Sequence, residues 1–156
     1  MHSRTKTFLI SVAVPLITGA VAALLTRGSM ETFGQLNKPP LSPPGYLFPI
    51  VWTILYILMG IASYLVLTSG QSSSAVKEAL IVYGLQLAVN FFWSIFFFNL
   101  EWYLFAFFWL ILLWILILYT IILFYPISKP AAYLMIPYLL WVTFAGYLNL
   151  AIYFLN

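Results

Sequence analysis

Four side chains of one apolar segment are spaced so that they fall on the same face of a helix. They follow one another at intervals of four, three and four residues: Gln86, Asn90, Trp93 and Phe97. Because an α-helix turns once every 3.6 residues, this spacing brings them into one stripe. Their amides and indole can hydrogen-bond a ligand, and their rings can stack on it. Alternatively, Gln86 and Asn90 bond neighbouring helices and only hold a bundle together.

Two other apolar segments combine a large aromatic residue with small residues on one helical face. The first face consists of Trp52, Tyr56, Met59 and Ser63, with Gly60 beside them. The second consists of Trp141, Ala145, Leu148 and Ile152, with Asn149 alongside. If all three faces converge, they enclose an apolar cavity with indole and amide donors. Such a cavity suits a flat hydrophobic ligand that carries a few polar atoms.

The apolar segments carry no Asp, Glu, Lys, Arg or His near their centres. Ion coupling and proton relay across a membrane normally need such a group, so the sequence disfavours a pump or an ion channel. Cysteine is absent, and the only histidine is His2. The sequence therefore predicts no metal site, no cofactor-binding site and no conventional general acid or base.

The composition indicates which kind of element positions these side chains. Of the 156 residues, 65% are hydrophobic and only 6% are charged, whereas a soluble domain carries about 25% charged residues. A water-soluble fold of this length could not bury so much apolar surface. The net charge of +3 comes from six basic and three acidic residues, which is too sparse for a nucleic-acid surface. We therefore expect one membrane domain over residues 1–156 and no nucleic-acid partner.

Apolar runs long enough to cross a lipid bilayer predict an all-α bundle of five transmembrane helices. Their expected bounds are residues 7–25, 48–67, 79–100, 102–125 and 131–155. The basic residues before the first run also resemble a signal peptide, but no small-residue cleavage site follows them. Basic residues are more numerous on the side of the amino terminus, so the positive-inside rule places that terminus in the cytoplasm.

One connection, residues 26–47, is longer than the others and contains four prolines in its second half. Long loops in compact bundles are usually lids or binding elements. Because each proline fixes φ and removes a donor, we expect an ordered, extended lid. The alternative is a rigid spacer.

Two small residues, Gly84 and Ala88, lie almost opposite the polar stripe of the third predicted span. A small residue at every fourth position lets two helices approach closely within lipid. This pair is a candidate dimer interface, and the alternative is packing within one bundle.

Three stretches closely resemble the translocator protein family, also called tryptophan-rich sensory proteins or peripheral-type benzodiazepine receptors. The stretches are KPPLSPPGYLFPIVWTILYILMGIASY, QLAVNFFWSIFFF and PYLLWVTFAGYLNLAIY. The number, order and spacing of the spans agree over nearly the whole chain. The small size is similar to that of bacterial members, so the resemblance implies an integral protein of a bacterial cell membrane.

The resemblance implies a five-helix bundle, commonly dimeric, whose cavity lies under the first long loop. In the family this cavity binds porphyrins and hydrophobic isoquinoline and benzodiazepine-type ligands. Carried onto this sequence, the binding residues would be Trp52, Tyr56, Asn90, Trp93, Trp141, Ala145 and Leu148. The family's sterol motif is incomplete, because Tyr147 is present but no Lys or Arg follows it. We therefore do not expect sterol binding.

Three functions follow from the resemblance. The first is a receptor or sensor that binds protoporphyrin IX. The second is an enzyme that degrades porphyrin in a light- or oxygen-dependent reaction, for which the resemblance implicates Trp52 and Trp141 as tentative catalytic residues. The third is a transporter of porphyrin or another hydrophobic molecule. In each of them the porphyrin is a ligand or a substrate and not a resident cofactor.

Overall fold

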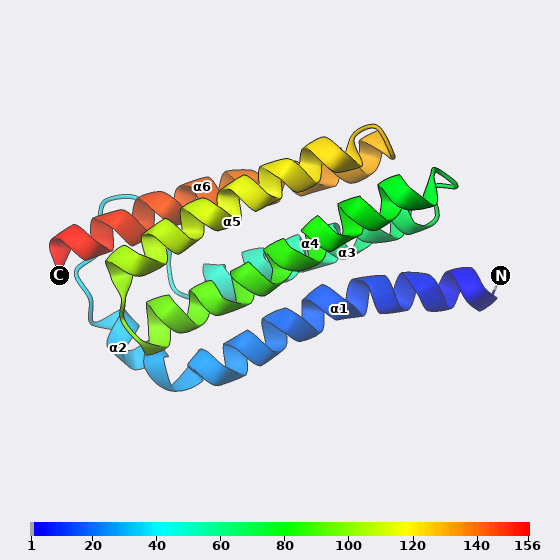
Figure 1. Ribbon diagram of the computed structural model, residues 1–156. Coiled ribbons are helices and arrows are strands. Elements are labelled where there is room, and N and C mark those ends of the chain that lie inside the picture. Colours follow the sequence, from blue (N-terminus) through cyan, green and yellow to red (C-terminus); the bar gives the residue numbers. More distant parts are fainter. Residues whose placement is uncertain (1) are drawn as a thin grey trace.

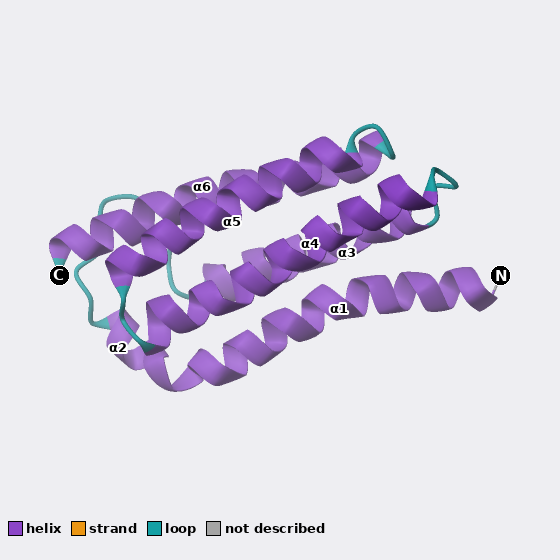
Figure 2. Ribbon diagram, viewed as in Figure 1, coloured by secondary structure: helices purple, strands orange, loops and turns teal. Residues whose placement is uncertain are grey.

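The computed structural model describes residues 2–156, with side chains from Ser3 onward, and is an elongated bundle of helices (Figure 1). The long helices are α1 (His2–Thr26), α3 (Leu47–Leu67), α4 (Ser73–Ser94), α5 (Tyr103–Phe124) and α6 (Lys129–Leu155). Within the described residues there is no strand, and short loops join most helices (Figure 2). The prediction of an all-α fold with five helices long and apolar enough to span a membrane is confirmed.

The two chain ends lie at opposite ends of the bundle, as an odd number of antiparallel spans requires (Figure 1). The α3–α4 and α5–α6 connections lie at the end of the described amino terminus, and the α1–α3 and α4–α5 connections lie at the carboxyl-terminal end. The cytoplasmic placement of the amino terminus stays a prediction.

Two stretches expected to be loop or regular α-helix have a different local structure. Residues 27–34 form a 3₁₀ turn, η1 (Arg27–Ser29), and a short helix, α2 (Met30–Gly34). The prolines begin only at Pro39, so nothing before them prevents helical geometry. The end of the third span forms a π-helical segment of five residues, η2 (Ile95–Asn99).

The segment 35–46 is anchored to the end of α6 by hydrogen bonds. The Asn37 backbone N–H donates to Asn156 Oδ1 at 3.1 Å, and Asn156 Nδ2 donates to the Asn37 carbonyl at 2.9 Å. Tyr147 OH donates to the Pro40 carbonyl at 2.8 Å. These bonds hold the proline-rich segment across the carboxyl-terminal end of the bundle, where a lid would lie.

Helices α1 and α3 approach each other most closely at a glycine. A Cβ atom added to Gly60 would lie 2.6 Å from Val12 Cα and 2.8 Å from the Ser11 carbonyl oxygen. Both neighbours are backbone atoms, so only glycine fits at this crossing. One turn before Gly60, the Tyr56 ring occupies the space where a side chain at Gly19 would lie. Tight packing at these two points fixes where α1 sits relative to α3.

Candidate functional site

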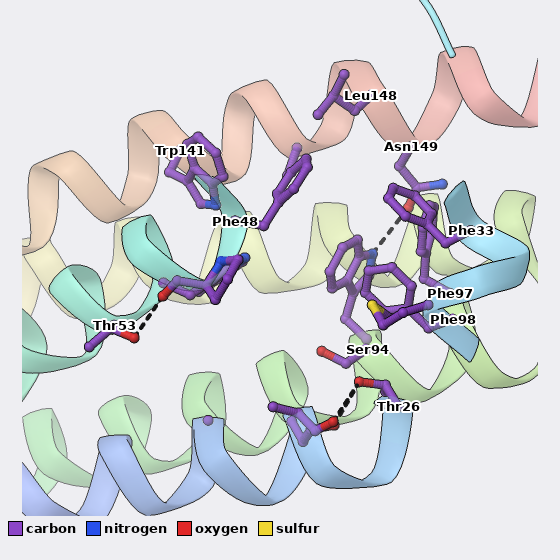
Figure 3. Close-up of a pocket in the computed structure, with 18 of the residues that line it drawn as sticks. Thr26, Phe33, Phe48, Thr53, Ser94, Phe97, Phe98, Trp141, Leu148 and Asn149 are labelled. Carbon is purple, nitrogen blue, oxygen red and sulfur yellow. Dashed lines mark hydrogen bonds between the residues drawn. The ribbon is translucent and has the colours of Figure 1, made fainter. Parts of the chain in front are cut away.

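A cavity of about 670 Å³ lies in the carboxyl-terminal half of the bundle. Helices α1, α3, α4 and α6 supply its walls, and η1, α2 and the segment 35–46 lie along its end. Figure 3 shows Thr26 on α1 facing Leu148 and Asn149 on α6 across this space. Its volume is within the range of about 300–1,000 Å³ that is typical of small-molecule sites.

The three helical faces identified in the sequence meet around this cavity. Six of the seven residues that the resemblance implies for ligand binding line it: Trp52, Tyr56, Trp93, Trp141, Ala145 and Leu148. They come from α3, α4 and α6, which are distant in sequence. The structure thus places these side chains where they could contact one ligand.

The aromatic rings of the cavity wall pack on one another in defined orientations. The Trp52 ring stacks on Tyr56, with ring centroids 5.6 Å apart. It also meets Trp141 edge to face, at 6.5 Å and an interplanar angle of 87°. Phe48 makes a further edge contact with Trp141 at 5.9 Å (Figure 3). Such contacts each stabilise the arrangement by about 0.5–1.5 kcal/mol beyond burial, so the wall is ordered before any ligand enters.

The indole N–H groups of the tryptophans differ in whether they have partners. Trp93 Nε1 donates to Asn149 Oδ1 at 3.0 Å. Trp109 and Trp114, in the apolar α5, also donate within the protein, to the Val89 carbonyl and to Thr143 Oγ1. In contrast, Trp141 Nε1 is buried and has no partner in the described part of the chain. A buried donor without a partner costs about 1–3 kcal/mol.

Asn90 is the exception among the implied binding residues, because it does not lie on the cavity wall. It is almost completely buried and takes part in a chain of hydrogen bonds. Tyr56 OH donates to Asn90 Oδ1 at 3.2 Å, Asn90 Nδ2 donates to Tyr138 OH at 2.6 Å, and Tyr138 OH donates to Gln86 Oε1 at 2.7 Å. Tyr56 therefore covers Asn90 on the cavity side. Gln86 and Asn90 therefore both hydrogen-bond neighbouring helices, which was the alternative to ligand binding.

Tyr138, which joins these groups, was not among the residues predicted from the sequence. We expect Tyr138→Phe to lower the free energy of unfolding by about 1–3 kcal/mol, because two buried amide groups lose their partner. Thermal unfolding in detergent measures this loss. Tyr153→Phe is the matched control, since Tyr153 lies on the same helix and is exposed. Equal midpoints for the two variants would contradict a structural role for the buried chain.

Two parts of the wall were missed by the sequence analysis. Helix α1 contributes a stripe of small residues at helical spacing: Gly19, Ala22, Ala23 and Thr26. This spacing is readable in the sequence, but the stripe carries no aromatic or amide group to distinguish it. Phe33 of α2 is the second part, and it meets Phe48, Phe97 and Phe98 edge to face at 5.2–6.3 Å.

The candidate dimer residues lie away from the cavity. Gly84 and Ala88 are both exposed on α4, and a Cβ at Gly84 would meet no atom within 4 Å. They are therefore not used for close packing within one bundle. The dimer contact itself stays a prediction.

Comparison with known proteins decides the family. Residues 11–155 match the model of the TspO/MBR family. The chain belongs to this family. Among its relatives, the tryptophan-rich protein TspO of Chlorobaculum tepidum is 38% identical, over 100% of this chain and 99% of the relative. This TspO/MBR protein is also 35% identical to the translocator protein of Bos taurus, over 87% of the chain and 82% of the relative.

A third relative, the tryptophan-rich sensory protein of Cereibacter sphaeroides, is 34% identical over 92% of the chain and 85% of the relative. The resemblance found in the sequence is thus confirmed. Membership of the TspO/MBR family and the five apolar helices together make this chain an integral membrane protein.

Proposed function

We propose that this TspO/MBR protein is a membrane receptor that binds protoporphyrin IX and other flat hydrophobic ligands in the cavity under segment 35–46. The observation that carries the proposal is the convergence of Trp52, Tyr56, Trp93 and Trp141 on one cavity of about 670 Å³. Flat aromatic ligands bind well between aromatic side chains that are already ordered. A sensory role is supported by the name of the relative from Cereibacter sphaeroides.

Titration of the detergent-purified protein with protoporphyrin IX tests this proposal. We expect saturable quenching of tryptophan fluorescence. The dissociation constant should rise about tenfold or more in Trp52→Phe and Trp141→Phe, because each variant loses an indole from the wall. Trp102→Phe is the control, since Trp102 is exposed and does not line the cavity. Quenching that does not saturate, or that weakens equally in all three variants, would show that ligand does not bind in this cavity.

A second function, porphyrin degradation, is favoured by the placement of the two implicated tryptophans. Trp52 and Trp141 lie on the same wall with ring centroids 6.5 Å apart, so one ligand could contact both. An indole next to a photoexcited macrocycle can donate an electron to it, and dioxygen would be the oxidant that the degradation needs. The same titration, repeated under illumination, separates the two functions. A receptor leaves the visible spectrum of the porphyrin intact, whereas an enzyme converts it to a new absorbing product only when both tryptophans are present.

A further inference from the structure

The charged residues on the cavity wall are all of one sign. Among the described residues, the lining includes two cations, Arg27 and Lys38, and no aspartate or glutamate. The rest of the wall is apolar, aromatic or neutral. A cavity in a membrane protein that exposes only positive charge at one place favours a ligand with negative charge at the matching place.

Both cations belong to the same end of the cavity. Arg27 begins η1, directly after α1, and Lys38 lies in the segment that follows α2. Together with Thr26 and Ser42, which also line the cavity, they form a polar group that we call the rim. The aromatic wall of Trp52, Tyr56 and Trp141 lies on α3 and α6. The site therefore has one polar end and one apolar body.

The two rim cations remain available to an anion. Lys38 Nζ donates to the Gly34 carbonyl at 3.2 Å and lies 4.9 Å from the centre of the Phe33 ring. Neither partner is negatively charged, and an ammonium group has three donors, so it can bond an anion as well. The Arg27 side chain is exposed and offers a planar set of donors that fits a carboxylate.

The neutral groups of the rim cannot take over this role. Thr26 Oγ1 donates to the Ala22 carbonyl at 2.9 Å, and Ser42 Oγ donates to the Pro39 carbonyl at 2.7 Å. Since each hydroxyl has a single proton, both are committed to the backbone. Of the four rim residues, Arg27 and Lys38 are therefore the two whose side chains are left to donate to a ligand.

We propose that the ligand of this cavity is an acidic amphiphile, with a carboxylate held by Arg27 and Lys38 and an apolar body against the aromatic wall. The proposal rests on the cavity-binding function above and specifies its ligand class. A tetrapyrrole that carries carboxylates on one edge fits this arrangement, and so does the acid group of an acyl lipid. The shared chemistry is a carboxylate at the end of a hydrophobic body.

The test compares protoporphyrin IX, which has free carboxylates, with its neutral dimethyl ester. We expect the free acid to bind about tenfold tighter than the ester at low salt, as two partly exposed charge pairs would produce. In the double variant Arg27→Gln, Lys38→Gln the acid should fall to the affinity of the ester, while the ester is unaffected. Lys77→Gln is the control, because Lys77 is exposed and does not line the cavity. High salt should weaken the binding of the free acid and leave the binding of the ester unchanged.

Each outcome has a distinct meaning. Equal affinities of acid and ester for the unmodified protein would overturn the carboxylate proposal and leave cavity binding intact. The absence of saturable binding for either would overturn both proposals. A preference for the acid that survives in the double variant would also overturn the role of the rim. Competition by oleate but not by methyl oleate would support the same rim contact with a lipid as the source, and competition by neither would assign it to the tetrapyrrole.

Discussion

Ala145→Phe is expected to abolish tight binding of protoporphyrin IX while leaving the helical fold intact. Ala145 lies on α6 one turn after Trp141, lines the cavity and is 8% exposed. A phenyl ring at this position would extend into the space that the ligand needs between α6 and the opposite wall. We expect the dissociation constant to rise about tenfold or more, which corresponds to about 1.4 kcal/mol or more. Saturable fluorescence quenching measures it.

The matched control for this variant is Ala75→Phe. Ala75 is an exposed alanine in the first turn of α4, at the other end of the bundle, and does not line the cavity. It adds the same ring to the protein without filling the cavity, so its binding should equal that of the unmodified protein. If Ala145→Phe retains full affinity and an unchanged unfolding temperature, the ligand binds elsewhere.

The sequence specified the membrane architecture because lipid leaves few choices for an apolar chain. A long uncharged run must satisfy its own backbone hydrogen bonds, and only a helix does so within a single segment. The predicted third, fourth and fifth spans therefore correspond to helices, although α4 begins six residues before the predicted span at residue 79. Four of the six residues at 73–78 are polar or charged, so hydropathy alone did not include them.

The aromatic part of the site could also be inferred from the sequence. Trp52 and Tyr56, or Trp141 and Ala145, share a helical face whatever the surrounding structure, because the 3.6-residue period fixes their directions. Periodicity cannot decide how deep a residue lies once another helix covers it. Asn90 illustrates this, since the spacing placed it with Trp93 but Tyr56 separates it from the cavity.

The part of the cavity wall that α1 forms could not be predicted from the sequence of α1 alone. Its stripe of Gly19, Ala22 and Ala23 is small and neutral, which fits equally well a lipid-facing surface, a helix contact or a cavity wall. Only the packing of α1 against Gly60 of α3 decides between them. The same is true of Arg27, which the sequence places only in a loop and the structure places on the cavity rim.

Gly60→Leu is expected to destabilise the bundle strongly. The added Cβ would lie 2.6 Å from Val12 Cα and 2.8 Å from the Ser11 carbonyl oxygen, and these backbone atoms cannot move aside without shifting all of α1. Overpacking typically costs about 1–3 kcal/mol, so Gly60→Ala should lower the unfolding free energy by about this much and Gly60→Leu by more. Thermal unfolding in detergent measures both.

Gly146→Ala provides the comparison, because a Cβ there would lie 3.7 Å from Leu110 Cδ2, an ordinary contact. It should leave stability nearly unchanged. Since α1 forms one wall of the cavity, displacement of this helix from α3 should also weaken protoporphyrin IX binding in Gly60→Ala, even at temperatures where that variant remains folded. Stability loss without any loss of affinity would show that α1 and its small-residue stripe are dispensable for the site, and binding would then depend on α3, α4 and α6 alone.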